Sequence, residues 1–447
     1  MDQDFAPPGP LAAPVGLRLP AWATRLGRFD LARYGGSLGV RGLEVLGKFG
    51  LYFVVARRLG AADSGLLFFC LTWVNLASSA ARMGLERTMT RHVAAELAVG
   101  QADAARHTMR TGLLWCSLGG VGWALMTMLL AGPAARHVFG QPELATPLAI
   151  SAILLVTQTL AIALGYALTG LNRGGLGQLL SASLPPTLVL LSLLAGLRGL
   201  NAVLLTYGLS CAICCVLAVI VLERDARAKV QTPPPPGLRP LPTLFRTAAP
   251  FLAVEMVQAC LVSLPLLLLG AFAPPGEVGA FSVASRISSL VWMVLMSIGS
   301  IAAPRFAELH RLGSHTRLSQ VNRASRLITL ACALPAVMAM LMAPELLLSL
   351  VGPHFETAAA SLMVLAMGQM VNCVAPLQDV LLGMTGHGRT LRWLSLAQLG
   401  LGAMIGVALI PTMGSLGAAI TTAISVAIGA IGTTLASRQL VPEAWEE

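Results

Sequence analysis

Long apolar segments separated by short polar ones fill most of the chain. A helix needs about 20 apolar residues to cross a bilayer, and twelve segments reach roughly that length. They are predicted at 31–59, 64–85, 108–132, 146–170, 175–197, 200–222, 243–273, 277–303, 322–350, 357–384, 390–411 and 415–437. The pattern predicts an all-α polytopic membrane protein with twelve transmembrane helices.

The composition supports a chain with little soluble mass. Of 447 residues, 56% are hydrophobic and only 11% are charged, with a mean hydropathy of +0.76. A soluble domain is typically about 25% charged. The net charge of +10 would suit a nucleic-acid partner, but the positions of the basic residues argue against one.

The basic residues alternate between the two sides of the predicted helices. If the N-terminus is cytoplasmic, 23 of the 30 Lys and Arg fall in cytoplasmic regions, four in outer loops and three within helices. This bias predicts that both termini are cytoplasmic. The segment 1–30 is expected to be a disordered cytoplasmic leader, because Asp2, Asp4 and several prolines replace the features of a secretory signal.

A hydrophilic, proline-rich stretch at 223–242 divides the chain into two halves of six helices. We expect an N-terminal bundle at 31–222, a cytoplasmic linker at 223–242, a C-terminal bundle at 243–437 and a cytoplasmic tail at 438–447. Because six helices return the chain to the same side, the two halves should be parallel repeats that face a central cleft. Such an arrangement is typical of an alternating-access transporter.

The two halves resemble each other at an offset of about 213–214 residues. After the first helix of each half, an acidic residue stands two positions before a glycine: Asp63 before Gly65, and Glu277 before Gly279. Glu44 in the first helix has an approximate counterpart in Glu255 of the seventh. The repeat supports the division into two equivalent bundles.

The first predicted helix carries three charges on one face. Arg41, Glu44 and Lys48 stand at spacings of three and four residues, which places them on one side of a helix. A charge at mid-bilayer costs about 2.5–3.5 kcal/mol, so this face should turn away from lipid. Two interpretations stay open: the face lines a wet cavity, or Arg41–Glu44 and Glu44–Lys48 form a salt-bridge ladder within the helix.

Other polar groups also fall within predicted spans. Arg286 is the third basic residue deep in a helix, and Glu255 and Asp379 are the other acidic ones. The carboxylates suit either salt bridges or a proton or sodium site. For the amides, interhelical hydrogen bonding is the expected role; they are Asn75, Gln158, Gln369 and Asn372.

Several motifs resemble those of a known family. The charged first helix is followed by Ala56-Arg57-Arg58-Leu59-Gly60, by Asp63-Ser64-Gly65, and by Gly84-Leu85 with basic residues through Arg91. This order resembles the opening of polysaccharide flippases, which belong to the multidrug/oligosaccharidyl-lipid/polysaccharide exporter superfamily. The resemblance implies translocation of undecaprenyl-pyrophosphate-linked oligosaccharide across the bacterial inner membrane, for exopolysaccharide or lipopolysaccharide O-antigen biosynthesis.

The resemblance also gives roles to the charged residues. A pyrophosphate group needs cationic partners, so Arg41, Lys48 and Arg286 are expected to bind it. Coupling or salt-bridge roles are expected for the three acidic residues Glu44, Glu255 and Asp379. We expect no catalytic residue, metal or cofactor, although a proton or sodium gradient would suit the transport cycle. A polysaccharide polymerase and a chain-length regulator are the expected protein partners.

Other functions remain as alternatives. A cation-coupled multidrug or toxin antiporter of the same superfamily would share the fold. A lipid II flippase usually has two more helices. A membrane enzyme that joins sugars would need a large outer loop with catalytic residues, whereas the outer loops here are short.

Overall fold

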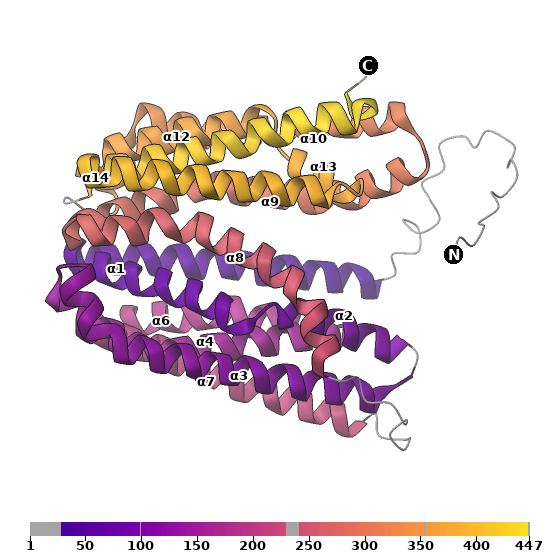
Figure 1. Ribbon diagram of the computed structural model, residues 1–447, viewed down its shortest axis with the longest axis horizontal. Coiled ribbons are helices and arrows are strands. Elements are labelled where there is room, and N and C mark those ends of the chain that lie inside the picture. Colours follow the sequence, from indigo (N-terminus) through magenta and orange to yellow (C-terminus); the bar gives the residue numbers. More distant parts are fainter. Residues whose placement is uncertain (1–27, 99, 229–240, 353–354, 446–447) are drawn as a thin grey trace, which may run out of the picture.

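The computed structural model describes residues 28–98, 100–228, 241–352 and 355–445, and every regular element in these residues is helical. The N-terminal half contains α1 Arg28–Arg82, α2 Leu85–Ala98, α3 Ala102–Pro133, η1 Ala134–Val138, η2 Pro142–Leu144, α4 Ala145–Gly170, α5 Gly174–Gln178, η3 Leu179–Ser183, α6 Leu184–Leu194 and α7 Leu200–Ala228. It forms the lower layer in Figure 1.

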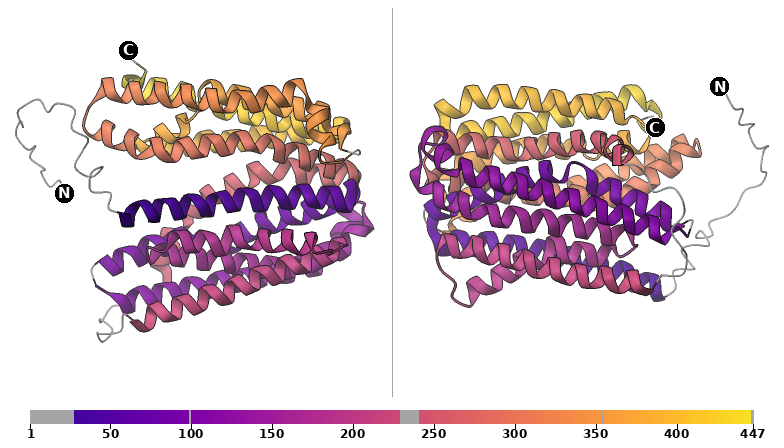
Figure 2. Two further views of the ribbon diagram at one scale, coloured as in Figure 1. Left: turned by 180° about the vertical axis from the view of Figure 1, so that it is seen from behind. Right: turned by 60° about the horizontal axis from the view of Figure 1, so that its bottom comes forward.

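The C-terminal half forms the upper layer in Figure 1, and α8 runs obliquely between the two layers. It contains α8 Leu241–Phe272, α9 Pro275–Arg311, α10 His315–Met342, α11 Pro344–Ser349, η4 Glu356–Ala358, α12 Ala359–Val374, α13 Gln378–Met384, α14 Gly388–Leu440 and η5 Pro442–Ala444. The long helices of both halves lie roughly side by side (Figure 2).

Two helices, α1 and α14, each fold back on themselves. They have 55 and 53 residues, so a straight helix at about 1.5 Å per residue would be far longer than a bilayer is thick. Each is interrupted by a glycine with a positive φ, 78° at Gly60 and 56° at Gly414. Ten helices are long and apolar enough to cross a membrane; with these two counted as pairs, the described residues contain the predicted twelve spans.

The predicted repeat is confirmed by where the helices begin. Three helices of the N-terminal half start at Ala102, Ala145 and Gly174, and their counterparts start 213 or 214 residues later, at His315, Ala359 and Gly388. The span that follows Gly60 likewise corresponds to α9, which starts at Pro275. We call the end of the molecule where α1 begins the terminal end, and the opposite end the Gly60 end.

Two predicted spans are broken where the sequence analysis treated them as continuous. The segment predicted at 322–350 is α10 and α11, which separate at Ala343, directly before a proline. The segment predicted at 357–384 is α12 and α13, with Pro376 in the break and Leu377 at a φ of 65°. Proline lacks the N–H that a helix needs and disfavours helical backbone before it, which explains both breaks.

The ends of the predicted bundles lie only partly in the described residues. Of the expected leader at 1–30, only the last three residues are described, and they belong to α1. The helix α7 continues to Ala228, into the expected linker at 223–242, and the proline run lies outside the described residues.

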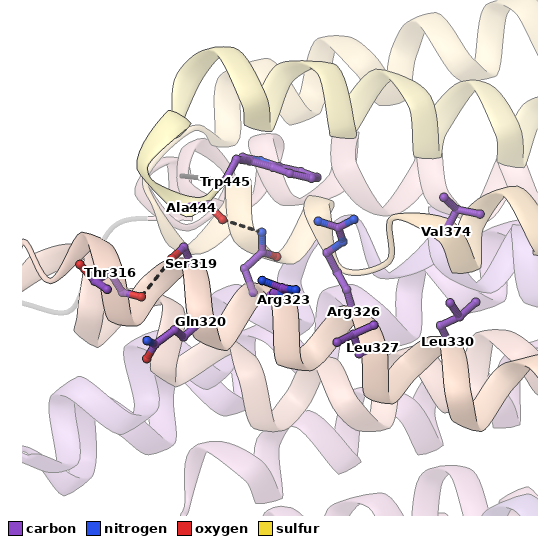
Figure 3. A pocket seen from close by; sticks show the side chains of 11 residues that line it. Thr316, Ser319, Gln320, Arg323, Arg326, Leu327, Leu330, Val374, Ala444 and Trp445 are labelled. Carbon is purple, nitrogen blue, oxygen red and sulfur yellow. Dashed lines mark hydrogen bonds between the residues drawn. The ribbon is translucent and has the colours of Figure 1, made fainter. Parts of the chain in front are cut away.

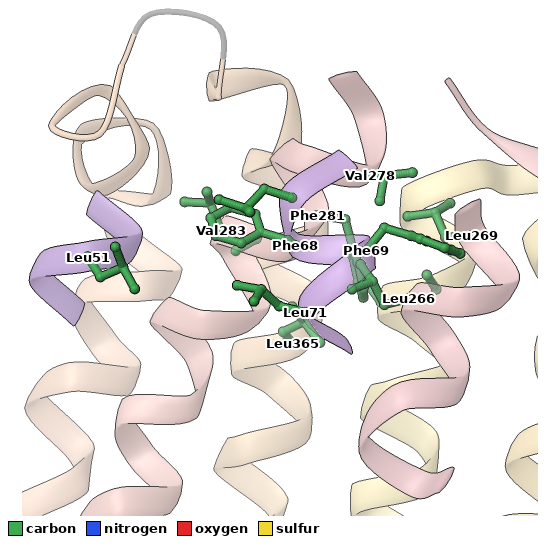
Figure 4. Packing of buried hydrophobic residues seen from close by; sticks show 14 of the residues in the cluster. Leu51, Phe68, Phe69, Leu71, Leu266, Leu269, Val278, Phe281, Val283 and Leu365 are labelled. Atoms are coloured by element: carbon green, nitrogen blue, oxygen red, sulfur yellow. The ribbon is translucent and has the colours of Figure 1, made fainter. Parts of the chain in front are cut away.

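One apolar core joins the two halves near the Gly60 end (Figure 4). From α1 it includes Leu51, Phe68, Phe69 and Leu71, and from the C-terminal half it includes Leu266, Leu269, Val278, Phe281, Val283 and Leu365. Phe68 and Phe281 are 0% and 2% exposed, so this part of the interface is dry. The packed contact fixes how the two halves meet.

Candidate functional site

Two repeat-related glycines bring α1 and α9 into backbone contact at the Gly60 end. A Cβ added to Gly65 would overlap the carbonyl oxygen of Pro275 and lie 2.8 Å from the N atom of Gly279. A Cβ added to Gly279 would overlap the carbonyl oxygen of Ala61 and lie 3.0 Å from the N atom of Gly65. The two contacts mirror each other, because Ala61 and Pro275 are also repeat-related. We call this contact the glycine seam.

Further contacts between the halves surround the seam. The side-chain amide of Gln141 donates hydrogen bonds to the carbonyl oxygens of Ala273, at 2.7 Å, and Gly270, at 3.2 Å. Phe69 packs against Gly270 and makes an edge-to-face contact with Phe139, with ring centroids 4.9 Å apart. The Gly60 end is therefore held by apolar packing, backbone contact and hydrogen bonds together.

Polar residues continue along one face of α1 toward the terminal end. Arg41, Glu44, Lys48 and Tyr52 follow each other at spacings of three or four residues, and we call them the α1 track. Lys48 Nζ donates to Glu44 Oε1 at 2.6 Å, and Gln178 Nε2 donates to Glu44 Oε2 at 2.9 Å. Both oxygens of Glu44 are thus engaged by groups from two different elements.

Only part of the predicted ladder forms in the structure. The Glu44–Lys48 pair is present, whereas the side chain of Arg41 is exposed and forms no ion pair among the described residues. A Cβ on Gly39 or Gly42 would meet no atom within 4 Å, so α1 is open around Arg41. Figure 1 and the left view of Figure 2 agree that α1 and the C-terminal half diverge toward this end.

Arg286 on α9 meets the α1 track at Tyr52. Its guanidinium carbon lies 3.6 Å from the ring centroid of Tyr52 and 4.7 Å from that of Phe68. A guanidinium group over an aromatic face is attracted by the negative charge of that face. The Nε atom of Arg286 is buried with no hydrogen-bond partner in the described structure. Arg286 therefore adds an unneutralised charge from the opposite half.

The combined cluster has an excess of positive charge. Arg41, Lys48 and Arg286 contribute three cationic groups, and the only carboxylate paired with any of them in the described residues is that of Glu44. From Arg41 to Tyr52 the track spans about 17 Å, at about 1.5 Å per residue. Tyr207 of α7 lies within electrostatic range of Tyr52, Arg286 and Glu44, so a third element joins the cluster.

The other two predicted carboxylates lie elsewhere. Glu255 of α8 forms an ion pair with Arg87 of α2, so it joins the two halves away from the α1 track. Around this pair, the first turns of α8 pack on the N-terminal half, with Gly84 against Ala248 and Leu252. Asp379 is exposed in the first turn of α13, and no described contact connects it to the α1 track.

The sequence analysis missed a buried ion pair in the N-terminal half. Arg82 and Glu86 are 6% and 1% exposed, and Arg82 Nε lies 3.2 Å from Glu86 Oε1. Two serines also accept hydrogen bonds from Arg82, and the pair flanks a break at Met83 and Gly84, which both have positive φ. The four-residue spacing between Arg82 and Glu86 was a signal in the sequence for this pair.

One of the predicted amide contacts is present. The side chain of Gln158 on α4 donates to Asn75 Oδ1 on α1 at 2.6 Å, which is an interhelical hydrogen bond of the expected kind.

A family model matches the part of the chain that contains the α1 track and Arg286. The model, described as polysaccharide biosynthesis protein, matches residues 37–310, which is more than half of the chain. The chain belongs to this polysaccharide biosynthesis family. A comparison with curated protein sequences found no match.

Solved structures show which fold this family member has. An inward-facing multidrug resistance MATE family transporter of the MOP superfamily has a TM-score of 0.68 at 15% identity, with 90% of this chain and 95% of that chain covered. The lipid II flippase MurJ in an inward closed conformation has a TM-score of 0.68 at 10% identity, with coverages of 92% and 89%. An outward-facing MATE family transporter has a TM-score of 0.57 at 14% identity, with coverages of 92% and 94%.

At these identities the likeness establishes the fold alone. The resemblance to the exporter superfamily, inferred from sequence motifs, is therefore confirmed at the level of family and fold. The family and the fold together support a multi-pass membrane flippase or transporter of polysaccharide biosynthesis.

Proposed function

We propose that this protein is a flippase that moves an undecaprenyl-pyrophosphate-linked oligosaccharide across the bacterial inner membrane, for exopolysaccharide or O-antigen biosynthesis. The observation that carries the proposal is the excess positive charge of the α1 track and Arg286, at the surface between the two halves. A pyrophosphate diester is anionic, and moving it through a membrane requires cationic groups to replace its hydration.

The three basic residues suit successive contacts with such a group. Arg41 is exposed toward the terminal end, Lys48 lies about two turns further along α1, and Arg286 stacks on Tyr52 one turn beyond Lys48. The buried Nε of Arg286 lacks a hydrogen-bond acceptor among the described residues, and a phosphate oxygen would supply one. In this proposal Glu44 holds Lys48 in place and does not carry the coupling ion.

The distribution of basic residues and the position of the glycine seam support a direction of transport. We propose that the terminal end is cytoplasmic, as the basic residues favour, and that the glycine seam closes the outer end of a cleft between the halves. In this proposal the conformation of the protein described here is inward-facing. The TM-scores support it, because the score is 0.68 against the inward-facing MATE transporter and 0.57 against the outward-facing one. Rocking of the halves would open the seam and deliver the pyrophosphate to the outer side.

The test is replacement of the three basic residues one at a time. Arg41→Ala, Lys48→Ala and Arg286→Ala are expressed in a bacterium whose own copy of the gene is deleted, and surface polysaccharide is measured against protein level. A charge-assisted hydrogen bond contributes about 1.5–3 kcal/mol, so each variant should lose roughly tenfold or more of the activity. Arg57→Ala is the matched control, because Arg57 is an exposed arginine at the other end of the same span.

Two outcomes would contradict the proposal. If all three variants made normal amounts of surface polysaccharide at normal protein levels, the basic residues would not be needed for transport. The main alternative is a cation-coupled multidrug antiporter, for which Asp379 is an exposed carboxylate. A deletion strain that becomes drug-sensitive while its surface polysaccharide and lipid-linked intermediates stay normal would favour the antiporter.

The wider setting of the proposed cycle is also open to experiment. A proton or sodium gradient is the proposed energy source, and a polysaccharide polymerase and a chain-length regulator are the proposed partners. Crosslinking in the native membrane tests the partners, and collapse of each gradient tests the coupling.

A further inference from the structure

Two side-chain amides lie next to each other in the N-terminal half, on α1 and α4. Gln158 Nε2 donates to Asn75 Oδ1 at 2.6 Å, and neither side chain has another hydrogen bond in the described structure. Asn75 is exposed and Gln158 is half-buried. A side-chain amide has one carbonyl oxygen and one NH2 group, so the pair keeps one donor group and one acceptor free, whichever way the two amides are turned.

The buried amides of the C-terminal half are arranged differently. Beside a cavity of about 550 Å³ between α10, α12 and the C-terminal segment, Asn322 donates to the carbonyl oxygen of Ala444 at 3.0 Å, a bond drawn in Figure 3. Asn322 also accepts from Gln378 at 3.1 Å, and Gln378 accepts from Ser437 at 3.0 Å. Both polar groups of each amide are therefore engaged, and both amides are 1% exposed. These amides are satisfied within the protein, unlike the pair on α1 and α4.

The position of Asn75 on α1 turns it toward the space between the halves. Asn75 stands seven residues after Phe68, on the same face of the helix. Phe68 is the residue whose ring lies 4.7 Å from the guanidinium carbon of Arg286, so this face is directed at the opposite half. Along it, Phe68 is 0% exposed, Thr72 is half-buried and Asn75 is exposed. The exposure increases in the direction in which α1 and the C-terminal half diverge (Figures 1 and 2).

The amide pair also lies at the depth of the α1 track. Tyr52 and Phe68 make an edge-to-face contact with ring centroids 5.7 Å apart, which fixes how the two arms of α1 stand beside each other. From this contact toward the terminal end, Asn75 is about 10 Å along one arm, and Lys48 and Glu44 are about 6 Å and 12 Å along the other, at about 1.5 Å per residue. The amides and the Glu44–Lys48 pair therefore border the same section of the space between the halves.

We propose that Asn75 and Gln158 bind hydroxyl groups of the sugar that follows the pyrophosphate. This inference rests on the proposed function. Each hydroxyl group of a sugar ring can donate and accept, so one hydroxyl accepts from the free NH2 group while its neighbour donates to the free carbonyl oxygen. The amides are uncharged, so they suit the sugar and leave the pyrophosphate to the cations of the α1 track and Arg286. A few placed polar groups of this kind fix the orientation of a ligand and provide specificity.

The test compares two lipids on the purified full-length protein in detergent, by titration and native mass spectrometry. One lipid is undecaprenyl pyrophosphate without sugar, and the other is the undecaprenyl-pyrophosphate-linked oligosaccharide extracted from the deletion strain. Asn75→Leu and Gln158→Met each remove one amide at similar side-chain volume, and the double variant leaves no amide unpaired between α1 and α4. Gln398→Met is the matched control, because Gln398 donates to the carbonyl oxygen of Ser425 within α14 and no described contact connects it to the α1 track.

We expect each amide variant to bind the oligosaccharide-bearing lipid roughly fivefold more weakly, as for the loss of one hydrogen bond, and to bind undecaprenyl pyrophosphate as before. Gln398→Met should leave both affinities unchanged, whereas Arg286→Ala should weaken both.

The outcomes separate this inference from the proposed function. If Arg286→Ala weakens binding of both lipids but the amide variants, the double one included, affect both lipids equally or not at all, the role of the amides in sugar binding is overturned and the proposed function stands. The same holds if Gln398→Met weakens binding of the oligosaccharide-bearing lipid as much as they do. If neither lipid binds, or if Arg286→Ala changes neither affinity, the proposed function fails and this inference fails with it.

Discussion

Adding one methyl group to the glycine seam should open the Gly60 end of the molecule. In Gly65→Ala the new Cβ would overlap the carbonyl oxygen of Pro275 and lie 2.8 Å from the N atom of Gly279, closer than an ordinary van der Waals contact. The atoms it meets are backbone, which cannot rotate away as a side chain would. The helices α1 and α9 must therefore separate where the seam closes.

The size of the effect follows from the cost of overpacking. An extra methyl group in a packed contact costs about 1–3 kcal/mol. The cost applies only to the conformation in which the seam is closed, so the equilibrium should shift toward an opened Gly60 end by roughly 5–150-fold. Gly279→Ala should have an effect of similar size, because the contact is mirrored by the repeat. The double variant should shift less than the product of the two, since both methyl groups disrupt one contact.

Thiol labelling from the Gly60 side measures this shift. A single cysteine is placed at Val283, which is 5% exposed and one turn beyond Gly279, in a chain whose eight native cysteines are replaced. A membrane-impermeant reagent should modify this cysteine roughly 5–150-fold faster in Gly65→Ala than in the chain with Gly65 unchanged, because the conformation with the seam open is more populated by that factor. Gly276→Ala is the control, because a Cβ there meets nothing within 4 Å. Labelling of Gly65→Ala and Gly279→Ala at the control rate would refute the reasoning.

Two further predictions concern the fold. Arg87→Glu should lower the free energy of unfolding of the purified protein by about 1 kcal/mol, because it breaks the ion pair with Glu255 that joins the halves. The effect is limited to this size because the side chain of Arg87 is 47% exposed. The swapped double variant Arg87→Glu/Glu255→Arg should recover most of the loss in a thermal melt, and no recovery would show that the pair does not contribute to stability. Gly60→Ala should cost about 1–3 kcal/mol of unfolding free energy through backbone strain, because the φ of 78° and ψ of 179° at Gly60 lie in a region that essentially only glycine adopts. A Cβ at Gly60 meets nothing within 4 Å, so no clash adds to this cost. In Gly132→Ala, where a Cβ also meets nothing within 4 Å, the same melt should show no loss, and equal melting temperatures would contradict the strain argument.

The charged residues show how far the sequence could predict the site. Spacing along one helix was enough to expect Glu44 beside Lys48, and the structure has that pair at 2.6 Å. Spacing could not show that Gln178 would bind the other oxygen of Glu44, or that Arg286 would stack on Tyr52. Those contacts join segments that are more than 100 residues apart. Binding of pyrophosphate by Arg41, Lys48 and Arg286 stays a prediction.

The breaks in the helices show a similar limit. Pro344 and Pro376 were visible in the sequence, yet proline is tolerated inside other helices of this chain, such as Pro304 in α9 and Pro335 in α10. Whether a proline ends a helix or only bends it depends on what satisfies the freed carbonyl groups nearby. That information lies in the packing around the proline.

The sequence by itself determined the all-helical class, the twelve spans and the repeat of about 214 residues, because these depend on apolar length and on backbone hydrogen bonds that close within each helix. Only the tertiary structure decided which faces meet. Apolar residues surround most of these helices, so their periodicity does not say which side packs on a neighbour. The meeting of Gly65 with Gly279, the pairing of Glu255 with Arg87 and the hydrogen bond from Gln158 to Asn75 arise from contacts between distant segments.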